Sequence, residues 1–427
     1  MTIAPVRPIV FWALGLLNNV SYVIMLASAK QISEGGTALV FLANVIPSLF
    51  VKLSAPYWFD RISYDTRLSV ATAFMGASFL VVALFQASTS PLALYFQLLG
   101  VALASAQSGL GEASLLALAG ACDASRAKPA CLSCFSSGTG VAGVFGFFYT
   151  FLLNDLLGLS LPITLVLATL LAAMYFGVYN RYLWGYKGMN CRVIRMSNLG
   201  EYIRTTSSPL EDDDQLMDES DHPEGIDVFH DESMPPLLKI HEMTTFQRLI
   251  LTFSLYPYMI PLFVVYAAEY TMQSGTWTAI GFPITSETAR SDFYFAANWA
   301  YQAGVFVSRS SGTLFTAPLW FIWLMPALQV LNVAIFWVVA VHHVLYSWWL
   351  LVGCFYVGLL GGAVYVHVFT RICVDVPAYT EFALSATSVA ADIGVVAADV
   401  MGVFIQSCLY AINGLQGAAV TCPIKFG

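Results

Sequence analysis

The stretch FVVYAAEYTMQSG, residues Phe263–Gly275, lies within an apolar run that extends over residues 250–274 and yet contains a glutamate, Glu269. A run of roughly 18 apolar residues or more is long enough to cross a membrane as an α-helix. An ionisable side chain inside such a helix is costly, about 2.5–3.5 kcal/mol for Asp, Lys or Arg, so it normally faces a bundle interior or water. The stretch therefore predicts a membrane-spanning helix that turns Glu269 toward a polar cavity.

The composition of the whole chain agrees with this reading. Of the 427 residues, 58% are hydrophobic and 10% are charged, against roughly 25% charged residues in ordinary soluble domains. Eighteen Lys and Arg with 26 Asp and Glu are too few for the surface of a soluble protein of this size. We therefore expect an all-α polytopic membrane protein whose first apolar run is the first span rather than a cleaved signal peptide.

Hydropathy predicts six spans, a long polar loop and five further spans, and a twelfth, shorter span stays open. The predicted spans are 8–28, 38–58, 68–87, 91–121, 131–153, 160–180, 250–274, 291–308, 314–340, 345–370 and 379–411. This divides the chain into an N-terminal half (1–180), a loop (181–248), a C-terminal half (249–411) and a tail (412–427).

Basic residues gather in alternate connections between the spans. Arg61 and Arg67 follow the second span, Arg126 and Lys128 follow the fourth, and four more open the loop after the sixth. Because positively charged connections stay on the cytoplasmic side, we expect the N-terminus and the 181–248 loop to be cytoplasmic. After eleven spans the C-terminus would lie on the opposite side.

The central loop holds most of the net charge of -8. Residues 181–248 contain thirteen acidic and seven basic residues, a composition typical of disorder. No basic groove is present for a nucleic acid. Within the loop, Asp212 with Leu216 and Met217 fits an acidic dileucine-type sorting pattern, with Met in place of the second Leu, so trafficking adaptors are candidate partners.

Six spans, a polar loop and a second helical half are typical of the major facilitator transporters, which bind substrate between their halves near the bilayer midplane. Asp60-Arg61 resembles the Asp-Arg turn after the second helix of that superfamily, although the glycines of the usual motif are missing. In that fold, helices 1, 4, 7 and 10 line the cavity. One set of polar residues falls on each of these four helices: Asn18 and Asn19, Glu112, Glu269, and His367.

Further polar residues lie within the predicted spans or, for Arg309, directly after one: Lys52, Tyr301, Gln302, Arg309, Asp392 and Asp399. Structural alternatives stay open for several candidates. Glu269 would be a structural acid paired with Lys52 or Arg309, and Glu112 would cap a helix broken near Gly109 and Gly111.

Other candidates have comparable alternatives. His367 would bond a neighbouring carbonyl, and Lys52 would extend its ammonium group to the cytoplasmic boundary. Asp392 and Asp399 would mark a wet interface between helices.

The sequence gives little reason to expect an enzyme, a metal or a cofactor. It contains no GxSxG and no HExxH motif. Cys131-x-x-Cys134 with Cys122 lacks a fourth zinc ligand. The eight cysteines show no obvious paired framework, so we expect no disulfide scaffold.

Several segments together resemble the battenin family, the lysosomal membrane proteins altered in juvenile Batten disease. They follow the family order over nearly all of the membrane core: NNVSYVIML (Asn18–Leu26), LANVIPSLFVKLSAP (Leu42–Pro56), GLGEASLLAL (Gly109–Leu118), SSGTGVAG (Ser136–Gly143), PLFVVYAAEY (Pro261–Tyr270), YQAGVFVSRSS (Tyr301–Ser311), GLLGGAVYVHVF (Gly358–Phe369) and EFALSATSVAADIG (Glu381–Gly394). The chain departs from the family at Asn44, often Asp, and at His367, often Asn. Mammalian members end in a prenylation box, whereas five residues follow Cys422 here, two too many for that box, so we do not expect prenylation.

The resemblance implies a lysosomal or vacuolar membrane protein with a major-facilitator-like fold, in a family linked to glycerophosphodiester export and to organelle pH. We therefore expect a transporter in which Lys52, Arg309 or His367 attracts the phosphodiester. Glu269 or Glu112 would carry a coupling proton. The alternative is a membrane scaffold that regulates organelle pH and trafficking through its acidic loop.

Overall fold

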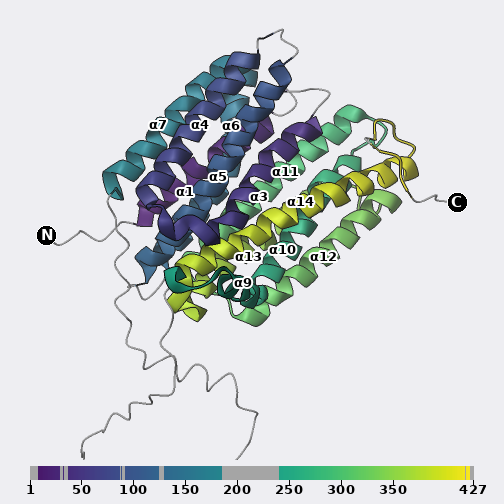
Figure 1. Cartoon of the computed structure of the whole chain (residues 1–427). Coiled ribbons are helices and arrows are strands. Elements are labelled where there is room, and N and C mark those ends of the chain that lie inside the picture. Colours follow the sequence, from purple (N-terminus) through teal and green to yellow (C-terminus); the bar gives the residue numbers. More distant parts are fainter. Residues whose placement is uncertain are drawn as a thin grey trace, which may run out of the picture.

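The structure, a computed structural model, describes residues 8–28, 32, 37–86, 88, 92–124, 129–184, 240–418 and 420–423. Within these ranges the chain is helical and contains no β-strand. Eleven long helices run side by side along the bundle (Figure 1), and they correspond one to one with the eleven predicted spans. The expectation of an all-α, two-half membrane bundle is confirmed.

The described part of the N-terminal half contains six long helices. They are α1 (Pro8–Ala27), α3 (Thr37–Trp58), α4 (Tyr64–Gln86), α5 (Ala93–Asp123), α6 (Ala130–Thr150) and α7 (Leu161–Tyr182). Helix α1 packs on α6, and α4 packs on α5 and α7. Small residues allow the closest of these contacts, since a Cβ at Gly15 or Gly138 would collide with the backbone of the facing helix.

The C-terminal half contains five long helices and one short one. They are the short α9 (Thr245–Ser254), then α10 (Tyr256–Thr271), α11 (Glu287–Arg309), α12 (Leu319–His342), α13 (Leu350–Asp375) and α14 (Thr380–Ile412). Glycines again set the closest approach: Gly304 on α11 meets the backbone of α13, and Gly358 on α13 meets the backbone of α11.

Eight of the described helices are long and apolar enough to cross a membrane, and α9 with the α10 segment forms a ninth if this bent pair counts as one span. The other two long helices, α3 and α11, contact the opposite half: α3 packs on α14, and α11 packs on α6. Helix α14 also packs on α5. These contacts between the halves surround the middle of the bundle.

The predicted span 250–274 differs from the structure at its beginning. Residues 250–254 belong to α9, which makes an angle of 64° with the α10 segment. Pro257 stands in the first turn of α10, where its missing N–H is harmless, but it could not sit inside one continuous helix without removing a hydrogen bond. The proline therefore explains why the chain bends here.

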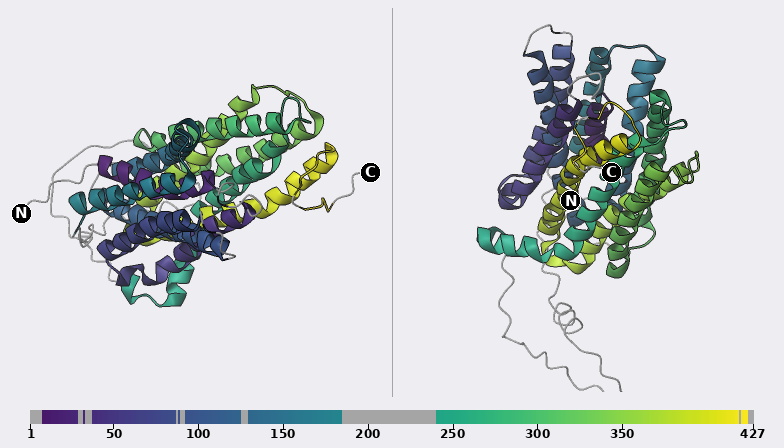
Figure 2. Two further views of the ribbon diagram at one scale, coloured as in Figure 1. Left: turned by 90° about the horizontal axis from the view of Figure 1, so that it is seen from above. Right: turned by 90° about the vertical axis from the view of Figure 1, so that its right-hand side faces the viewer.

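The bundle has two distinct ends. We call the end that carries Asp60, the short α9 and the start of α14 the loop end, because residues 185–239 connect to it. We call the other end, where α14 finishes at Ile412, the tail end (Figures 1 and 2). At the tail end a disulfide joins Cys408 to Cys422. A single disulfide is not the scaffold that the sequence argues against, but the pairing itself was not foreseen, because a separation of 14 residues in a single chain tail gives no recognisable cysteine framework.

Candidate functional site

A cavity of about 100 Å³ lies between the two halves. Its walls come from both halves, through α1, α3 and α5 on one side and α10, α11, α13 and α14 on the other. The lining residues are Asn19, Tyr22, Asn44, Val45, Ser48, Lys52, Ser108, Glu112, Tyr266, Tyr270, Arg309, Tyr365, Ala391, Asp392 and Val395. Four of these carry a formal charge, which is unusual inside a membrane bundle and marks the cavity as the candidate site.

Lys52 occupies the centre of an ion-pair cluster on one wall of this cavity. Its Nζ atom lies 2.7 Å from a carboxylate oxygen of Glu112 and 2.8 Å from one of Asp392. The Lys52 side chain is 2% exposed, so the ammonium group does not reach the membrane boundary, and the alternative that it does so is wrong. The Ser48 hydroxyl also donates to Asp392, at 2.7 Å.

Arg309 forms the opposite wall. Its guanidinium donates to Thr139 Oγ1 at 2.5 Å and to the Tyr266 hydroxyl at 2.9 Å. The guanidinium carbon also lies 4.1 Å from the centroid of the Tyr365 ring, a cation–π contact. The buried Nε atom of Arg309 has no hydrogen-bond partner among the described residues. A buried, unsatisfied donor of a charged group costs free energy, so the other contacts of Arg309 must hold it in this position.

Tyr365 joins the two walls. Its hydroxyl donates to Glu112 at 2.5 Å, while its ring lies under Arg309. Lys52 and Arg309 bring two positive charges to the cavity, and Glu112 and Asp392 bring two negative charges. The cavity is therefore formally neutral, and any anion that enters it adds a net negative charge. The alternative that Glu112 only caps a broken helix is wrong, since α5 is continuous through Gly109 and Gly111.

Glu269 is 1% exposed and does not line this cavity. It accepts a hydrogen bond from the Tyr301 hydroxyl at 3.0 Å and one from Gln329 Nε2 at 3.5 Å. Within the described residues no Lys or Arg lies within ion-pair distance of it, so the predicted pairing with Lys52 or Arg309 is not formed. A Cβ at Gly361 would collide with its carboxylate.

The rotation of α10 explains this position. Successive residues of an α-helix are turned by about 100°, so Tyr266 and Tyr270 lie about 40° apart around the axis, while Glu269 is offset by about 60° from Tyr266 and about 100° from Tyr270. The two tyrosines reach the cavity, while Glu269 points into the C-terminal half toward Tyr301 and Gln329. Glu269 was expected to face the cavity, but Tyr266 and Tyr270 of the same helix face it instead.

His367 lies outside the cavity and is 1% exposed. Its two ring nitrogens lie 3.1 Å from the Ser311 hydroxyl and 3.3 Å from the backbone nitrogen of Ala317, and its ring centroid lies 4.6 Å from that of Phe315. These contacts fasten α13 to the segment between α11 and α12. His367 therefore has a local bonding role, close to the alternative predicted for it, and is not placed to meet a solute in the cavity.

The asparagines of α1 divide between two environments. Asn19 lines the cavity, whereas Asn18 is fully buried and bonds the Ser108 carbonyl at 3.2 Å, Gln107 at 3.1 Å and Tyr175 at 3.1 Å. Asn18 thus holds α1, α5 and α7 together.

The remaining predicted residues lie apart from the cavity. Gln302 lies against Gly143 at a narrow gap between α11 and α6, and Tyr301 belongs to the Glu269 cluster. Asp399, two turns from Asp392, is partly exposed on α14. The sorting residues Asp212, Leu216 and Met217 lie outside the described residues.

The sequence interpretation missed several contributors. Tyr22, Tyr270 and Tyr365 line the cavity, and Thr139 supports Arg309. Tyrosines within apolar helices resemble ordinary core residues in sequence. One signal in the sequence was the spacing of Tyr266 and Tyr270, which lie four residues apart on one side of a helix and next to Glu269.

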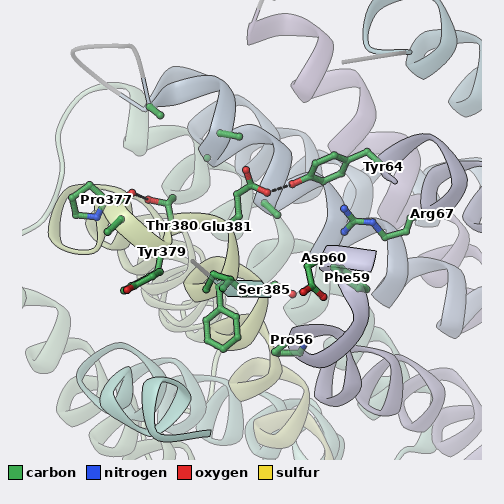
Figure 3. Close-up of a pocket in the computed structure, with 17 residues that line it drawn as sticks. Pro56, Phe59, Asp60, Tyr64, Arg67, Pro377, Tyr379, Thr380, Glu381 and Ser385 are labelled. Atoms are coloured by element: carbon green, nitrogen blue, oxygen red, sulfur yellow. Dashed lines mark hydrogen bonds between the residues drawn. The ribbon is translucent and has the colours of Figure 1, made fainter. Parts of the chain in front are cut away.

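A second cavity, of about 240 Å³, lies at the loop end between α4 and the start of α14. Tyr64 and Arg67 face Glu381 and Ser385 across it, and the Tyr64 hydroxyl donates to Glu381 (Figure 3). Arg67 lies between the rings of Phe59 and Tyr64, at 4.3 and 4.1 Å from their centroids. Among the residues that the structure describes, no group of three His, Cys, Asp or Glu side chains is arranged to hold a metal ion.

The protein has the fold of the major facilitator transporters. Its structure superposes on a crystal structure of the Escherichia coli fucose:proton symporter FucP with a TM-score of 0.56 and 10% identity, covering 94% of this chain and 96% of that one. A structure of FucP in the outward conformation gives a TM-score of 0.54 at 11% identity, over 95% and 98% of the two chains. At this identity the likeness shows the fold alone.

The family follows from the sequence. The model of the CLN3 protein family matches residues 9–412. Protein BTN1 of Eremothecium gossypii is 33% identical over 419 residues, covering 93% of this chain and 94% of that protein. Protein BTN1 of Chaetomium globosum is 34% identical over 436 residues, covering 96% and 89%. The chain belongs to the CLN3, or battenin, family.

Proposed function

We propose that the protein is a transporter of the lysosomal or vacuolar membrane that exports a small anionic metabolite, a glycerophosphodiester, to the cytosol by alternating access. The observation that carries this proposal is Arg309, whose guanidinium lines the cavity and keeps one buried donor without a partner among the described residues. A phosphodiester group offers oxygen acceptors and a single negative charge, which is what such a guanidinium binds. The family and the fold favour transport over catalysis.

Arg309 is a better anion ligand than the other two predicted cations. Lys52 already contacts two carboxylates, at 2.7 and 2.8 Å, so its charge is compensated within the protein. His367 does not line the cavity. The tyrosine hydroxyls of Tyr22 and Tyr270, with the amide of Asn19, surround the same space and would bond the hydroxyl groups of the glycerol moiety.

Charge balance in the cavity supports coupling to protons. Two cations and two carboxylates leave the empty cavity formally neutral, and a monoanionic phosphodiester would add one uncompensated negative charge in a low-dielectric region, which is costly. One proton taken up by Glu112 or Asp392 restores neutrality. We therefore propose that substrate and one proton move together, with the Lys52 cluster as the proton site and buried Glu269 as the second candidate.

Alternating access requires the contacts between the halves to break and re-form. The Lys52–Asp392 pair joins α3 to α14, and the Arg309–Thr139 bond joins α11 to α6. Both contacts belong to the proposed binding groups, so a proton or a substrate arriving there competes directly with the bonds that hold the halves together. In the proposed orientation the loop end faces the cytosol and the tail end faces the lumen.

The test is uptake of labelled glycerophosphodiesters into liposomes that carry the purified protein under an imposed pH gradient. Wild type is compared with Arg309→Gln, Glu112→Gln and Glu269→Gln, and Arg371→Gln serves as the control because Arg371 pairs with Asp375 within α13, away from the cavity. The proposal expects flux in wild type and in the control and a strong loss in Arg309→Gln. Folded wild-type protein without flux of any phosphodiester would overturn it.

A further inference from the structure

Helix α9 is a short amphipathic helix with its apolar side uncovered. Phe246, Leu249, Ile250 and Phe253 lie at the spacing i, i+3, i+4, i+7, which places them on one face of the helix. Their side chains are 69%, 39%, 54% and 69% exposed. Exposed apolar side chains gathered on one helix face mark a surface that contacts a partner or a membrane.

The opposite face of α9 is firmly attached to the protein. Arg248 is 5% exposed and donates to Asp60 at 2.9 Å, to the Pro56 carbonyl at 3.1 Å and to the Ile240 carbonyl at 2.8 Å. The first turn is closed by a capping box between Thr244 and Gln247. The rotation of α9 about its own axis is thus fixed, and the apolar face is held outward.

The position of α9 indicates what its exposed apolar face contacts. The helix makes an angle of 64° with the α10 segment and crosses the loop end of the bundle (Figure 2). Directly after α9 in the chain, Tyr256 and Ile260 of α10 are 59% and 42% exposed, on a helix of the candidate span. An exposed apolar face that precedes the exposed apolar residues of a span, on a helix turned across that span, fits the boundary between lipid head groups and acyl chains.

We infer that α9 lies in this boundary layer of the bilayer at the loop end, with Phe246, Leu249, Ile250 and Phe253 in lipid and Arg248 bound to Asp60 of the N-terminal half. The only basic residue of α9 points inward, so apolar burial and not attraction to anionic head groups holds the helix there. The bilayer then covers the outer side of α9, whose inner side contacts the N-terminal half through Arg248 and Asp60. This inference depends on the membrane-spanning bundle and not on the transported solute.

The test places the photo-reactive residue p-benzoyl-phenylalanine at Phe253 or at Phe246 of the full-length protein in vesicles containing a traceable phosphatidylcholine. Gln247, exposed on the neighbouring polar face, is the matched control within α9. Val330, 53% exposed on α12, is the positive control for lipid contact. We expect lipid labelling at Phe253 and Phe246 that approaches the level at Val330 and exceeds that at Gln247 several-fold.

The same experiment is repeated with phosphatidylserine mixed into the vesicles, and the labelling is expected to stay within about twofold because no basic residue of α9 faces outward. Labelling at both phenylalanines no higher than at Gln247 would overturn the inference. So would cross-linking of both phenylalanines to a second copy of the chain in place of lipid. Two labelled positions keep the result interpretable if one variant fails to fold.

Discussion

Lys52 of α3 and Asp392 of α14 form an ion pair of 2.8 Å between the two halves of the bundle. The same ammonium group contacts Glu112 of α5 at 2.7 Å. One buried cation therefore contacts two carboxylates that come from opposite halves, and the stability of this conformation and the proposed proton site depend on the same three side chains.

Replacing Lys52 with methionine removes the cation and leaves the carboxylates of buried Glu112 and partly buried Asp392 without their shared partner. Breaking a buried ion pair on one side costs about 3–5 kcal/mol, so we expect a markedly lower midpoint of thermal unfolding for Lys52→Met in detergent. The triple variant Lys52→Met, Glu112→Gln, Asp392→Asn should recover most of the loss. A triple variant as unstable as Lys52→Met would show that the charge is not the cause.

Replacing Arg309 with glutamine removes the proposed anion ligand. A hydrogen bond to a charged group contributes about 1.5–3 kcal/mol, which corresponds to an affinity about 10- to 200-fold weaker. The concentration dependence of phosphodiester flux should shift accordingly, while Arg371→Gln, which removes an equal charge from the Arg371–Asp375 pair within α13, should leave it unchanged. Equal shifts in both variants would contradict a local role for Arg309.

Replacing Gly361 with alanine inserts a methyl group against the carboxylate of Glu269. Overpacking a buried site costs about 1–3 kcal/mol, and the loss should be read from the thermal midpoint. Gly177→Ala is the control, because nothing lies within 4 Å of a Cβ there and alanine favours the helix.

Combining Gly361→Ala with Glu269→Ala tests whether the two positions are in contact. Residues that touch show non-additive effects, so the double variant should be less destabilised than the sum of the single variants. Strict additivity would contradict the close approach of α13 to Glu269.

Replacing Arg248 with alanine removes four hydrogen bonds at the loop end, two of them to Asp60. The guanidinium is buried, whereas the Asp60 side chain is 23% exposed, so we expect a loss of about 1.5–3 kcal/mol. Adding Asp60→Asn to Arg248→Ala should cause little further loss, because the partner is already gone. A full second loss in the double variant would contradict the pairing.

Deleting residues 211–231 separates the two proposed kinds of function. A transporter whose binding groups lie in the helical bundle should keep its flux in liposomes after the deletion, and only its delivery to the organelle should change. A scaffold that acts through the acidic loop should lose its function even when correctly delivered. Flux in purified vesicles and organelle location in cells are measured on the same variant.

The fold was largely predictable, because apolar runs long enough to cross a membrane are a strong signal. The eleven predicted ranges match helices in the structure. The bend before α10 was missed, since a pattern of apolar residues does not distinguish a continuous span from an amphipathic helix followed by Pro257. The capping box at Thr244 and Gln247 was the local signal that a separate helix begins there.

The candidate site was predictable in its charged residues and not in their pairing. Lys52, Glu112 and Asp392 were identified because charges within spans are rare, and Arg309 was identified as an available cation directly after the span 291–308. All four line the cavity. Which acid meets Lys52 depends on how α3, α5 and α14 approach one another, and nothing in one sequence encodes that distance. Glu269 illustrates the limit: a rotation of α10 of less than a third of a turn decides whether the carboxylate faces the cavity or the C-terminal half.

The disulfide between Cys408 and Cys422 makes the tail end of the bundle chemically different from the loop end. Disulfides persist in compartments that lack the thiol reductants of the cytosol, so an oxidised pair at the tail end is compatible with only one way of crossing the membrane. A thiol reagent that cannot cross membranes is applied to intact organelles and, in the presence of a reductant, to opened organelles. Comparison of the labelling of the two cysteines in these samples shows on which side of the membrane their sulfur atoms lie. The side of the membrane on which this disulfide lies therefore indicates the orientation of the whole bundle.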